Sequence, residues 1–328
     1  MVRKKQSSGM KGRPMETVTE WIKKNSHALV NRKPDEPLDD LRPLAPLVRD
    51  ARIVALGAAA RQTRELSDVA HRIVRLLVEE EGFRSLALEG DDPGRLGLDA
   101  YVATGDGDPR ALLGSARPFW QTAEILDLVH WMRSYNKRHP GDPVRFAQLP
   151  AEPARHTARL EGLAELERTL ADGVSWWQQL TGDKVVYWGG MAHTAVGAPR
   201  TVSPSEPLES HQNMGGYLRE RLGPDYRSVG LTMAHGSIGR PLPAPRPDFV
   251  DSLLHAAAEN RAGYVLDLIT PQPEPIRRLL DAPTRTRLIG PSYDPRDDAA
   301  FHMSGGSLAS WFDVVVHTQE VTPSRPLP

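Results

Sequence analysis

Two side chains able to move protons stand directly after predicted strands of this chain. Glu89 ends the apolar run that begins at Phe83, and His193 follows the run Lys184–Trp188 after a Gly-Gly turn. Carboxylates and imidazoles are the usual general acids and bases of proteins. Because ligands of parallel sheets lie beside the carboxyl ends of the strands, both residues are candidates for acid–base chemistry.

Each candidate also has an ordinary structural interpretation. Glu89 precedes Gly90 and two aspartates, and a solvated loop acid would look the same. Glu65 lies one turn into a predicted helix, where a carboxylate also complements the helix dipole. A single histidine such as His193 is commonly a packed or surface residue. The residues alone leave these alternatives open.

The elements that must position these residues alternate between strand and helix. An i, i+3, i+4 stripe from Leu66 to Leu77 predicts a helix after the first strand, and Gly82 suits its end. Further helices are predicted over 16–29, 121–137 and much of 152–181. Strands are predicted at 53–56, 83–89, 144–147, 184–188, 226–233, 264–269 and 312–317. This alternation predicts an α/β fold with a mostly parallel sheet flanked by helices on both faces.

The domain boundaries follow from proline-rich and charged stretches. Residues 1–42 are predicted to form an N-terminal tail and helix, and 43–320 a single α/β domain. Within it, residues 151–183 are predicted to form a short helical cap. Residues 321–328 are expected to be a C-terminal tail.

Several segments, in order, resemble the erythromycin esterase family. The most specific are Phe119–Glu124 (FWQTAE), Trp131–Asn136 (WMRSYN) and Met214–Arg219 (MGGYLR). The resemblance extends over most of residues 50–320. It implies an α/β core with a helical cap, and opening of macrolide lactones by water attack, without a covalent serine intermediate or an obligatory metal.

The chain departs from the family pattern where the family keeps its base. In the turn after the first strand, Ala58 replaces an acid and Arg61 replaces a histidine. After a later strand, Gly190 replaces one histidine, and only His193 remains. A guanidinium stays protonated and is no base, but it can hold a carboxylate, an enolate or an oxyanion. The resemblance therefore predicts a catalytic set of Glu89, His193, Arg61 and Glu65.

Other side chains are candidates for substrate binding: Trp176, Trp177, Arg133 and His235. The tryptophan pair could line a cleft or belong to the core, and Arg133 could be a structural ion-pair member. Ser237 nearly completes a nucleophile elbow, but the first glycine is missing and prolines follow where a helix is needed. No spacing of histidines is typical of a metal site, so no metal and no cofactor are expected.

The composition of the chain excludes several kinds of partner and site. Its 328 residues have a net charge of −1, which gives no electrostatic reason to expect nucleic acid or a membrane as a partner. The sequence has no cysteine, which excludes disulfides and thiol catalysis. No run is long and apolar enough for a membrane span or signal peptide, so a cytoplasmic protein is expected. The excess of arginine over lysine indicates a GC-rich bacterial genome, such as an actinobacterial one.

Three functions are consistent with these features. The first is an enzyme of bacterial secondary metabolism that cyclises, eliminates from or rearranges a small apolar, polyketide- or macrolide-like molecule. The second is a non-catalytic ligand-binding protein, and the third a true lactone hydrolase with a relocated base. The sequence favours an enzyme with a small-molecule substrate. It does not identify the substrate, the reaction or the oligomeric state.

Overall fold

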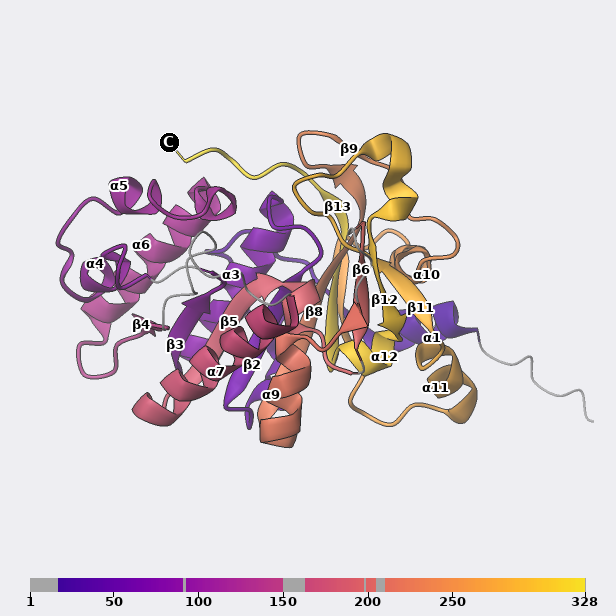
Figure 1. The fold of residues 1–328 in the computed structure, drawn as a ribbon, viewed down its shortest axis with the longest axis horizontal. Helices are drawn as coiled ribbons and strands as arrows, with labels where there is room; N and C mark the ends of the chain where they lie inside the picture. The colour runs from indigo at the N-terminus through magenta and orange to yellow at the C-terminus, as the bar shows by residue number, and fades with distance from the viewer. Residues whose placement is uncertain (1–16, 91–92, 150–162, 198, 205–209, 328) are drawn as a thin grey trace, which may run out of the picture.

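The computed structural model describes residues 17–90, 93–149, 163–197, 199–204 and 210–327, and it contains two sheets (Figure 1). The larger sheet has the strand order β1-β10-β13-β8-β2-β5-β3-β4, with β9 paired to β8. Its strands are β1 (Ser26–Ala28), β2 (Ile53–Ala58), β3 (Phe83–Leu88), β4 (Arg145–Phe146), β5 (Lys184–Gly190), β8 (Tyr226–Ser237), β9 (Pro241–Leu242), β10 (Gly263–Asp267) and β13 (Val314–Val321).

The six strands from β13 to β4 in this order are parallel to their neighbours, which confirms the predicted α/β fold with a mostly parallel sheet. The prediction was incomplete at one edge, where β10 and β1 run antiparallel. There the chain leaves α1 at Asn25 and enters β1 at once, so the helix predicted over 16–29 is shorter at its end.

The smaller sheet was not predicted. It joins β11 (Thr284–Arg287), β12 (His302–Gly306), β6 (Arg200–Ser203) and β7 (Ser210–His211) in that order. These strands are short and rich in polar residues, so they carry neither an apolar run nor a clear alternation. Their pairing depends on contacts between segments far apart in the chain, which periodicity does not reveal.

Helices cover both faces of the large sheet. They are α1 (Val18–Asn25), α2 (Ala45–Val48), α3 (Arg64–Glu79), α4 (Leu98–Thr104), α5 (Pro109–Leu113), α6 (Ala123–Arg138), α7 (Leu163–Thr181), α8 (Met191–Thr194), α9 (Met214–Leu222), α10 (Val250–Ala258), α11 (Glu274–Leu280) and α12 (Leu308–Trp311). Short 3-10 helices lie at Arg42–Leu44, Pro118–Trp120, Gly223–Asp225 and Pro295–Ala300. None of the described helices is both long and apolar enough to cross a membrane.

Successive residues of β2 pack into two separate hydrophobic cores, one on each face of the sheet. Val54 and Leu56 pack with α3, α6 and α10, whereas Ile53 and Ala55 pack with α7 and α9 on the opposite face. This alternation follows from the two-residue repeat of a strand buried on both sides. Figure 1 shows α7 and α9 in front of the sheet.

The predicted cap lies only partly within the described residues. Its residues 151–162 lie outside them, and over the remainder α7 packs directly on the sheet. The end of the chain runs along the N-termini of α3 and α6. Thr322 accepts a hydrogen bond from Arg64 N at 2.9 Å, and Arg325 O accepts one from Ala123 N at 3.0 Å.

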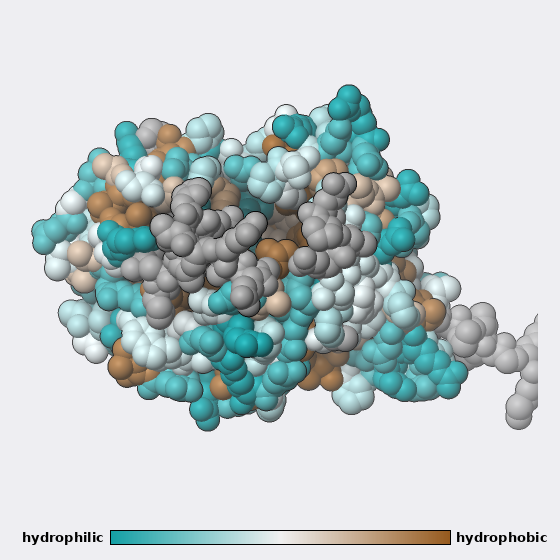
Figure 2. Space-filling view, viewed as in Figure 1, coloured by the Kyte–Doolittle hydropathy of each residue, from teal (hydrophilic) through white to brown (hydrophobic). Residues whose placement is uncertain are grey.

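The visible part of the face towards the viewer is largely hydrophilic. Figure 2 shows hydrophobic residues there only in small separate groups. Trp176 and Leu180 of α7 are among the large hydrophobic side chains that remain exposed. Scattered exposed apolar residues are normal on a protein surface and do not by themselves indicate an interface.

Candidate functional site

The site forms where three parallel strands end beside one another. Glu89 directly follows β3, Gly190 ends β5, and Arg61 lies in the loop after β2. Glu89 N donates to Trp188 O at 3.0 Å, which extends the pairing of β3 with β5 by one residue. The sheet thereby carries the Glu89 carboxylate to the edge at which ligands bind in open α/β sheets.

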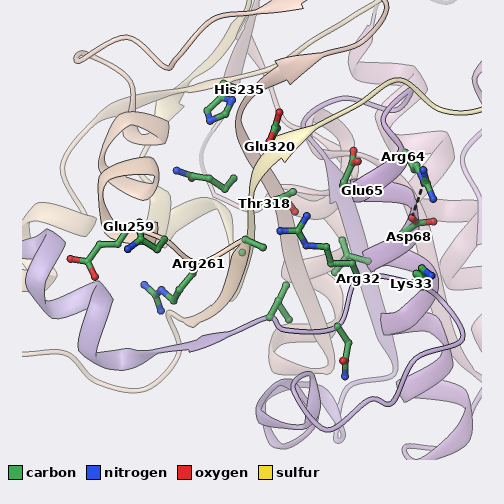
Figure 3. A pocket seen from close by; sticks show the side chains of 17 residues that line it. Arg32, Lys33, Arg64, Glu65, Asp68, His235, Glu259, Arg261, Thr318 and Glu320 are labelled. Atoms are coloured by element: carbon green, nitrogen blue, oxygen red, sulfur yellow. Dashed lines mark ion pairs between the residues drawn. The ribbon is translucent and has the colours of Figure 1, made fainter.

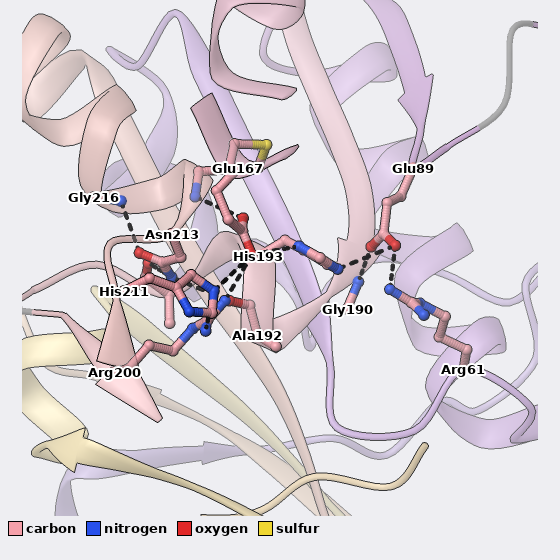
Figure 4. A network of polar contacts seen from close by, with 12 residues as sticks. Arg61, Glu89, Glu167, Gly190, Ala192, His193, Arg200, His211, Asn213 and Gly216 are labelled. Carbon is pink, nitrogen blue, oxygen red and sulfur yellow. Dashed lines mark hydrogen bonds and ion pairs between the residues drawn. The ribbon is translucent and has the colours of Figure 1, made fainter. Parts of the chain in front are cut away.

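The Glu89 carboxylate is buried and engaged on both oxygens (Figure 4). Arg61 Nη2 donates to Oε1, and Gly190 N donates to Oε2 at 2.7 Å. The Arg61 guanidinium also lies over the Phe119 ring, 4.6 Å from its centroid. Arg61 therefore reaches into the site where the family resemblance implies a histidine, and it binds an acid there.

His193 lies between two carboxylates. Its Nδ1 is 2.9 Å from Glu167 Oε1, and its Nε2 is 3.4 Å from Glu89 Oε1. The imidazole comes from the short helix α8, and its side chain is 19% exposed, against 6% for Glu89. Gly57 allows α8 to lie this close to β2, because a Cβ there would be 2.0 Å from Thr194 Oγ1.

Glu167 of α7 is a site residue that the sequence analysis missed. Its carboxylate accepts from Arg200 Nη2 at 2.9 Å and from Met214 N at 2.9 Å, and His211 Nε2 lies 3.8 Å away. Glu167 occupies an apolar position of the helix, between Leu166 and Leu170. An acid on the buried face of a predicted helix is the signal that could have identified it.

These contacts determine the charges of the site. Burial alone would raise the pKa of Glu89, but the positive charges of His193 and Arg61 outweigh burial and lower it. The pKa of Glu167 is lowered in the same way, with His193 as the main opposing charge. Burial would lower the pKa of His193, but Glu167 and Glu89 outweigh it and raise that pKa. The arrangement therefore favours an imidazolium between two carboxylates.

The pH dependence of stability follows from these directions. The raised pKa of His193 contributes stability that is complete below its unfolded pKa of about 6.5 and is lost as pH rises through the folded value. The lowered pKa of Glu89 contributes stability that is complete above about 4.3 and is lost as pH falls. We expect an NMR titration of His193 to give a pKa above about 6.5. A value below it would contradict the charge assignment.

The departures at positions 61 and 190 are sterically linked. A Cβ on Gly190 would lie 2.7 Å from Arg61 Nη2. Gly190 itself has φ −80° and ψ 144°, which any residue adopts, so the contact and not the backbone excludes a larger residue. A side chain at position 190 therefore requires the Arg61 guanidinium to shift from its place on Glu89.

Gly190→Ala should therefore destabilise the protein by about 1–3 kcal/mol, because the guanidinium must leave its place on Glu89. In the Arg61→Ala background the same change should cost less. Denaturant unfolding of both pairs measures this coupling, and Gly290→Ala, with open space around its Cβ, is the matched control. Equal costs in both backgrounds would exclude the steric link.

The other predicted site residues lie elsewhere. The Glu65 carboxylate accepts from Thr322 N at 2.6 Å and from Thr322 Oγ1 at 2.7 Å, and so holds the C-terminal segment. Arg133 donates to the carbonyls of Ala103 and Thr104 at the end of α4. His235 lies in a pocket that Glu65 also lines.

The tryptophan pair is divided between surface and core. Trp177 is buried, and its Nε1 donates to Ser85 Oγ at 2.9 Å, whereas Trp176 is 46% exposed. Neither contacts Glu89 through a hydrogen bond. Trp120 does, since its Nε1 donates to Glu89 O at 3.0 Å. Within the described residues, no group of three or more potential metal ligands comes together.

The arrangement suits proton transfer beside an anion-binding position. His193 is a proton donor held in place by Glu167, and Arg61 and the Gly190 N–H are donors at the same edge. Glu89 is a weak base while Arg61 binds it, because its protonated form is disfavoured.

Comparisons with known proteins agree with this fold. A relative in Escherichia coli, erythromycin esterase type II, is 29% identical over 119 residues, which are 36% of this chain and 28% of that protein. A solved Bacillus cereus structure aligns with a TM-score of 0.77 at 20% identity, covering 94% of this chain and 98% of its own. A mutant of the erythromycin esterase EreC in its open conformation aligns with a TM-score of 0.64 at 15% identity, covering 93% and 99%.

The family model for erythromycin esterase matches residues 78–149 and 147–321. These stretches carry β3, β5 and α8, and thus Glu89, Gly190 and His193, as well as the strands on either side of β2. Since the match extends over well more than half of the sequence, the chain belongs to the erythromycin esterase family.

Proposed function

We propose that this protein is an enzyme that transfers protons on a small apolar, polyketide- or macrolide-like molecule of bacterial secondary metabolism, without hydrolysing it. Cyclisation, elimination and rearrangement are the reaction classes that its side chains can support. The main support is that Arg61 and Gly190 N–H occupy the Glu89 carboxylate while His193 carries an acidic proton.

In an elimination, each group has a defined part. His193 gives its Nε2 proton to the departing substrate oxygen as the carbon–oxygen bond breaks. The imidazole, now neutral, takes the proton on the neighbouring carbon, whose bonding electrons form the new carbon–carbon double bond. His193 thereby regains its proton, so the substrate loses one water and the enzyme is unchanged, while Glu89, 3.4 Å from Nε2, stays ionised and stabilises the imidazolium.

Arg61 has two roles in this proposal. Its guanidinium lowers the basicity of Glu89 towards water, and it lies where negative charge would develop on a substrate oxygen. Arg61 Nε is buried and has no hydrogen-bond partner among the described residues. A substrate oxygen accepting from this N–H would satisfy it.

Lactone hydrolysis is the second candidate function. It is favoured by one observation: the Glu89–His193 pair is present, and Arg61, at 25% exposure, is the group that blocks it. Movement of Arg61 onto the lactone carbonyl oxygen would release Glu89 to activate water. This route needs the pKa of Glu89 to rise once Arg61 has left.

Mass spectrometry of a macrolide lactone incubated with the protein distinguishes these routes. Loss of one water, or an isomer of equal mass and different retention, supports the proposal, whereas gain of one water identifies a lactone hydrolase. The Arg61→His variant restores the residue type that the family resemblance implies, and Arg138→His on the exposed end of α6 is its control. No conversion despite measurable binding would contradict both routes and favour a binding protein.

A further inference from the structure

A pocket lies apart from the Glu89 site, on the face of the sheet that α3 covers (Figure 3). Its volume is about 460 Å³, within the usual range of small-molecule sites. It lies between the loop after β1, the first turn of α3, the start of β10 and the end of β13. Glu65 and His235, two residues that the sequence singled out, line this pocket.

The loop that carries two of its cations is held in a defined shape. The backbone N–H groups of Arg32 and Lys33 donate to Glu36 Oε2 at 2.6 and 2.8 Å. Both side chains are exposed, so the loop presents them to solvent and to the pocket. Figure 3 shows the Arg32 guanidinium reaching towards Thr318 of β13.

A buried ion pair, Arg72–Asp40, fixes the same loop through hydrogen bonds to its backbone. Arg72 of α3 and Asp40 have side chains only 1% and 5% exposed, and their shortest contact is 2.5 Å. Arg72 also donates to Asn31 O and Pro37 O at 2.6 Å each. Burying two charges is unfavourable unless their hydrogen bonds are well made, so this loop is fixed more firmly than an exposed turn requires.

The pocket is lined by four acidic and four basic side chains, but not all of them are paired. Three of its four carboxylates have partners: Glu259 with Lys23 at 2.5 Å, Glu65 with Thr322 at 2.6 Å, and Asp68 with Arg64 at 3.6 Å. In the described part of the chain, the side chains of Arg32 and Lys33 form no ion pair. The two cations are therefore available to a ligand.

We propose that this pocket binds a small hydroxylated anion, one with a phosphate or carboxylate group on a hydroxyl-bearing body. Arg32 and Lys33 hold the anionic group, because a guanidinium fork matches two oxygens of a phosphate or carboxylate. Glu320, Thr318 and His235 line the remaining wall and bond the ligand's hydroxyl groups. The exposed carboxylate of Glu320 repels an anion, and a hydroxyl group that donates to it would offset this repulsion.

Isothermal titration calorimetry tests this site with glucose 6-phosphate, glucuronate, glucose and inorganic phosphate. We expect at least one of the two sugar anions to bind, inorganic phosphate to bind more weakly, and glucose not to bind. Whichever of the two sugar anions has the lower Kd shows whether the site prefers a phosphate or a carboxylate group. Arg32→Ala should raise its Kd by about tenfold or more, the usual effect of losing a charge-assisted hydrogen bond.

Two controls make the result specific. Arg278→Ala removes another exposed arginine, on α11, and should leave the Kd unchanged. The His193→Gln variant should bind the sugar anion as the unmodified protein does, which separates this site from the proposed reaction. The site is excluded if neither sugar anion binds at millimolar concentration, if glucose binds equally well, or if Arg32→Ala has no effect.

Discussion

Replacing His193 with glutamine should lower the rate of substrate conversion by roughly 10²- to 10⁴-fold, the usual contribution of a general acid or base. Glutamine keeps a hydrogen-bonding group near Glu167 and Glu89 but carries no transferable proton. The rate is measured by mass spectrometry on the substrate that the first assay identifies. Because the side chain is only 19% exposed, a thermal unfolding scan must accompany the assay.

The matched control is His130→Gln, which changes an exposed histidine of α6 that bonds only Tyr101 among the described residues. It should retain the full rate. If His193→Gln also retained its rate within a factor of about three, equivalent to about 0.7 kcal/mol, His193 would not be the proton donor. The reaction would then depend on Glu89 or on a group outside this pair.

Glu167→Gln should destabilise the protein by about 3–5 kcal/mol, because it leaves the buried Arg200 guanidinium without its carboxylate. Both side chains of this pair are 2% exposed, so little solvent screens the change. It should also lower the pKa of His193, since Glu167 is the main charge that raises it. Denaturant unfolding and an NMR titration measure the two effects separately.

Glu220→Gln removes an exposed acid of the neighbouring helix α9 and should change stability by less than about 0.5 kcal/mol. Adding Arg200→Met to Glu167→Gln should recover part of the loss, because the unpaired buried charge is removed. If Glu167→Gln left the pKa of His193 unchanged, Glu167 would be a structural residue and not one that positions the imidazole.

The linked contacts at positions 61, 89 and 190 explain how this chain differs from the pattern that its family resemblance implies. Arg61 fills the space beside Gly190 and neutralises Glu89. A side chain added at position 190 would meet Arg61 unless the guanidinium moved away. Both departures therefore lie at one place, where a cation is bound to a retained carboxylate.

The sequence by itself determined the parallel strands and two of the central site residues. The runs ending at Leu56, Leu88 and Trp188 are apolar because both sheet faces are covered, and that pattern is local. Glu89 and His193 could be identified because they follow such runs directly. The pairing of Arg61 with Glu89 could also be predicted, because the parallel strands that precede them end at the same edge of the sheet.

Only the tertiary structure decided which polar groups meet. Glu167 is separated from His193 by 26 residues and from Glu89 by a strand crossover, and no repeat in the sequence links them. Glu65 follows the same first strand as Arg61, yet it turns to Thr322, because the rotation of helix α3 places it on another side. Side-chain direction at the end of an element depends on packing between distant segments, which local periodicity does not encode.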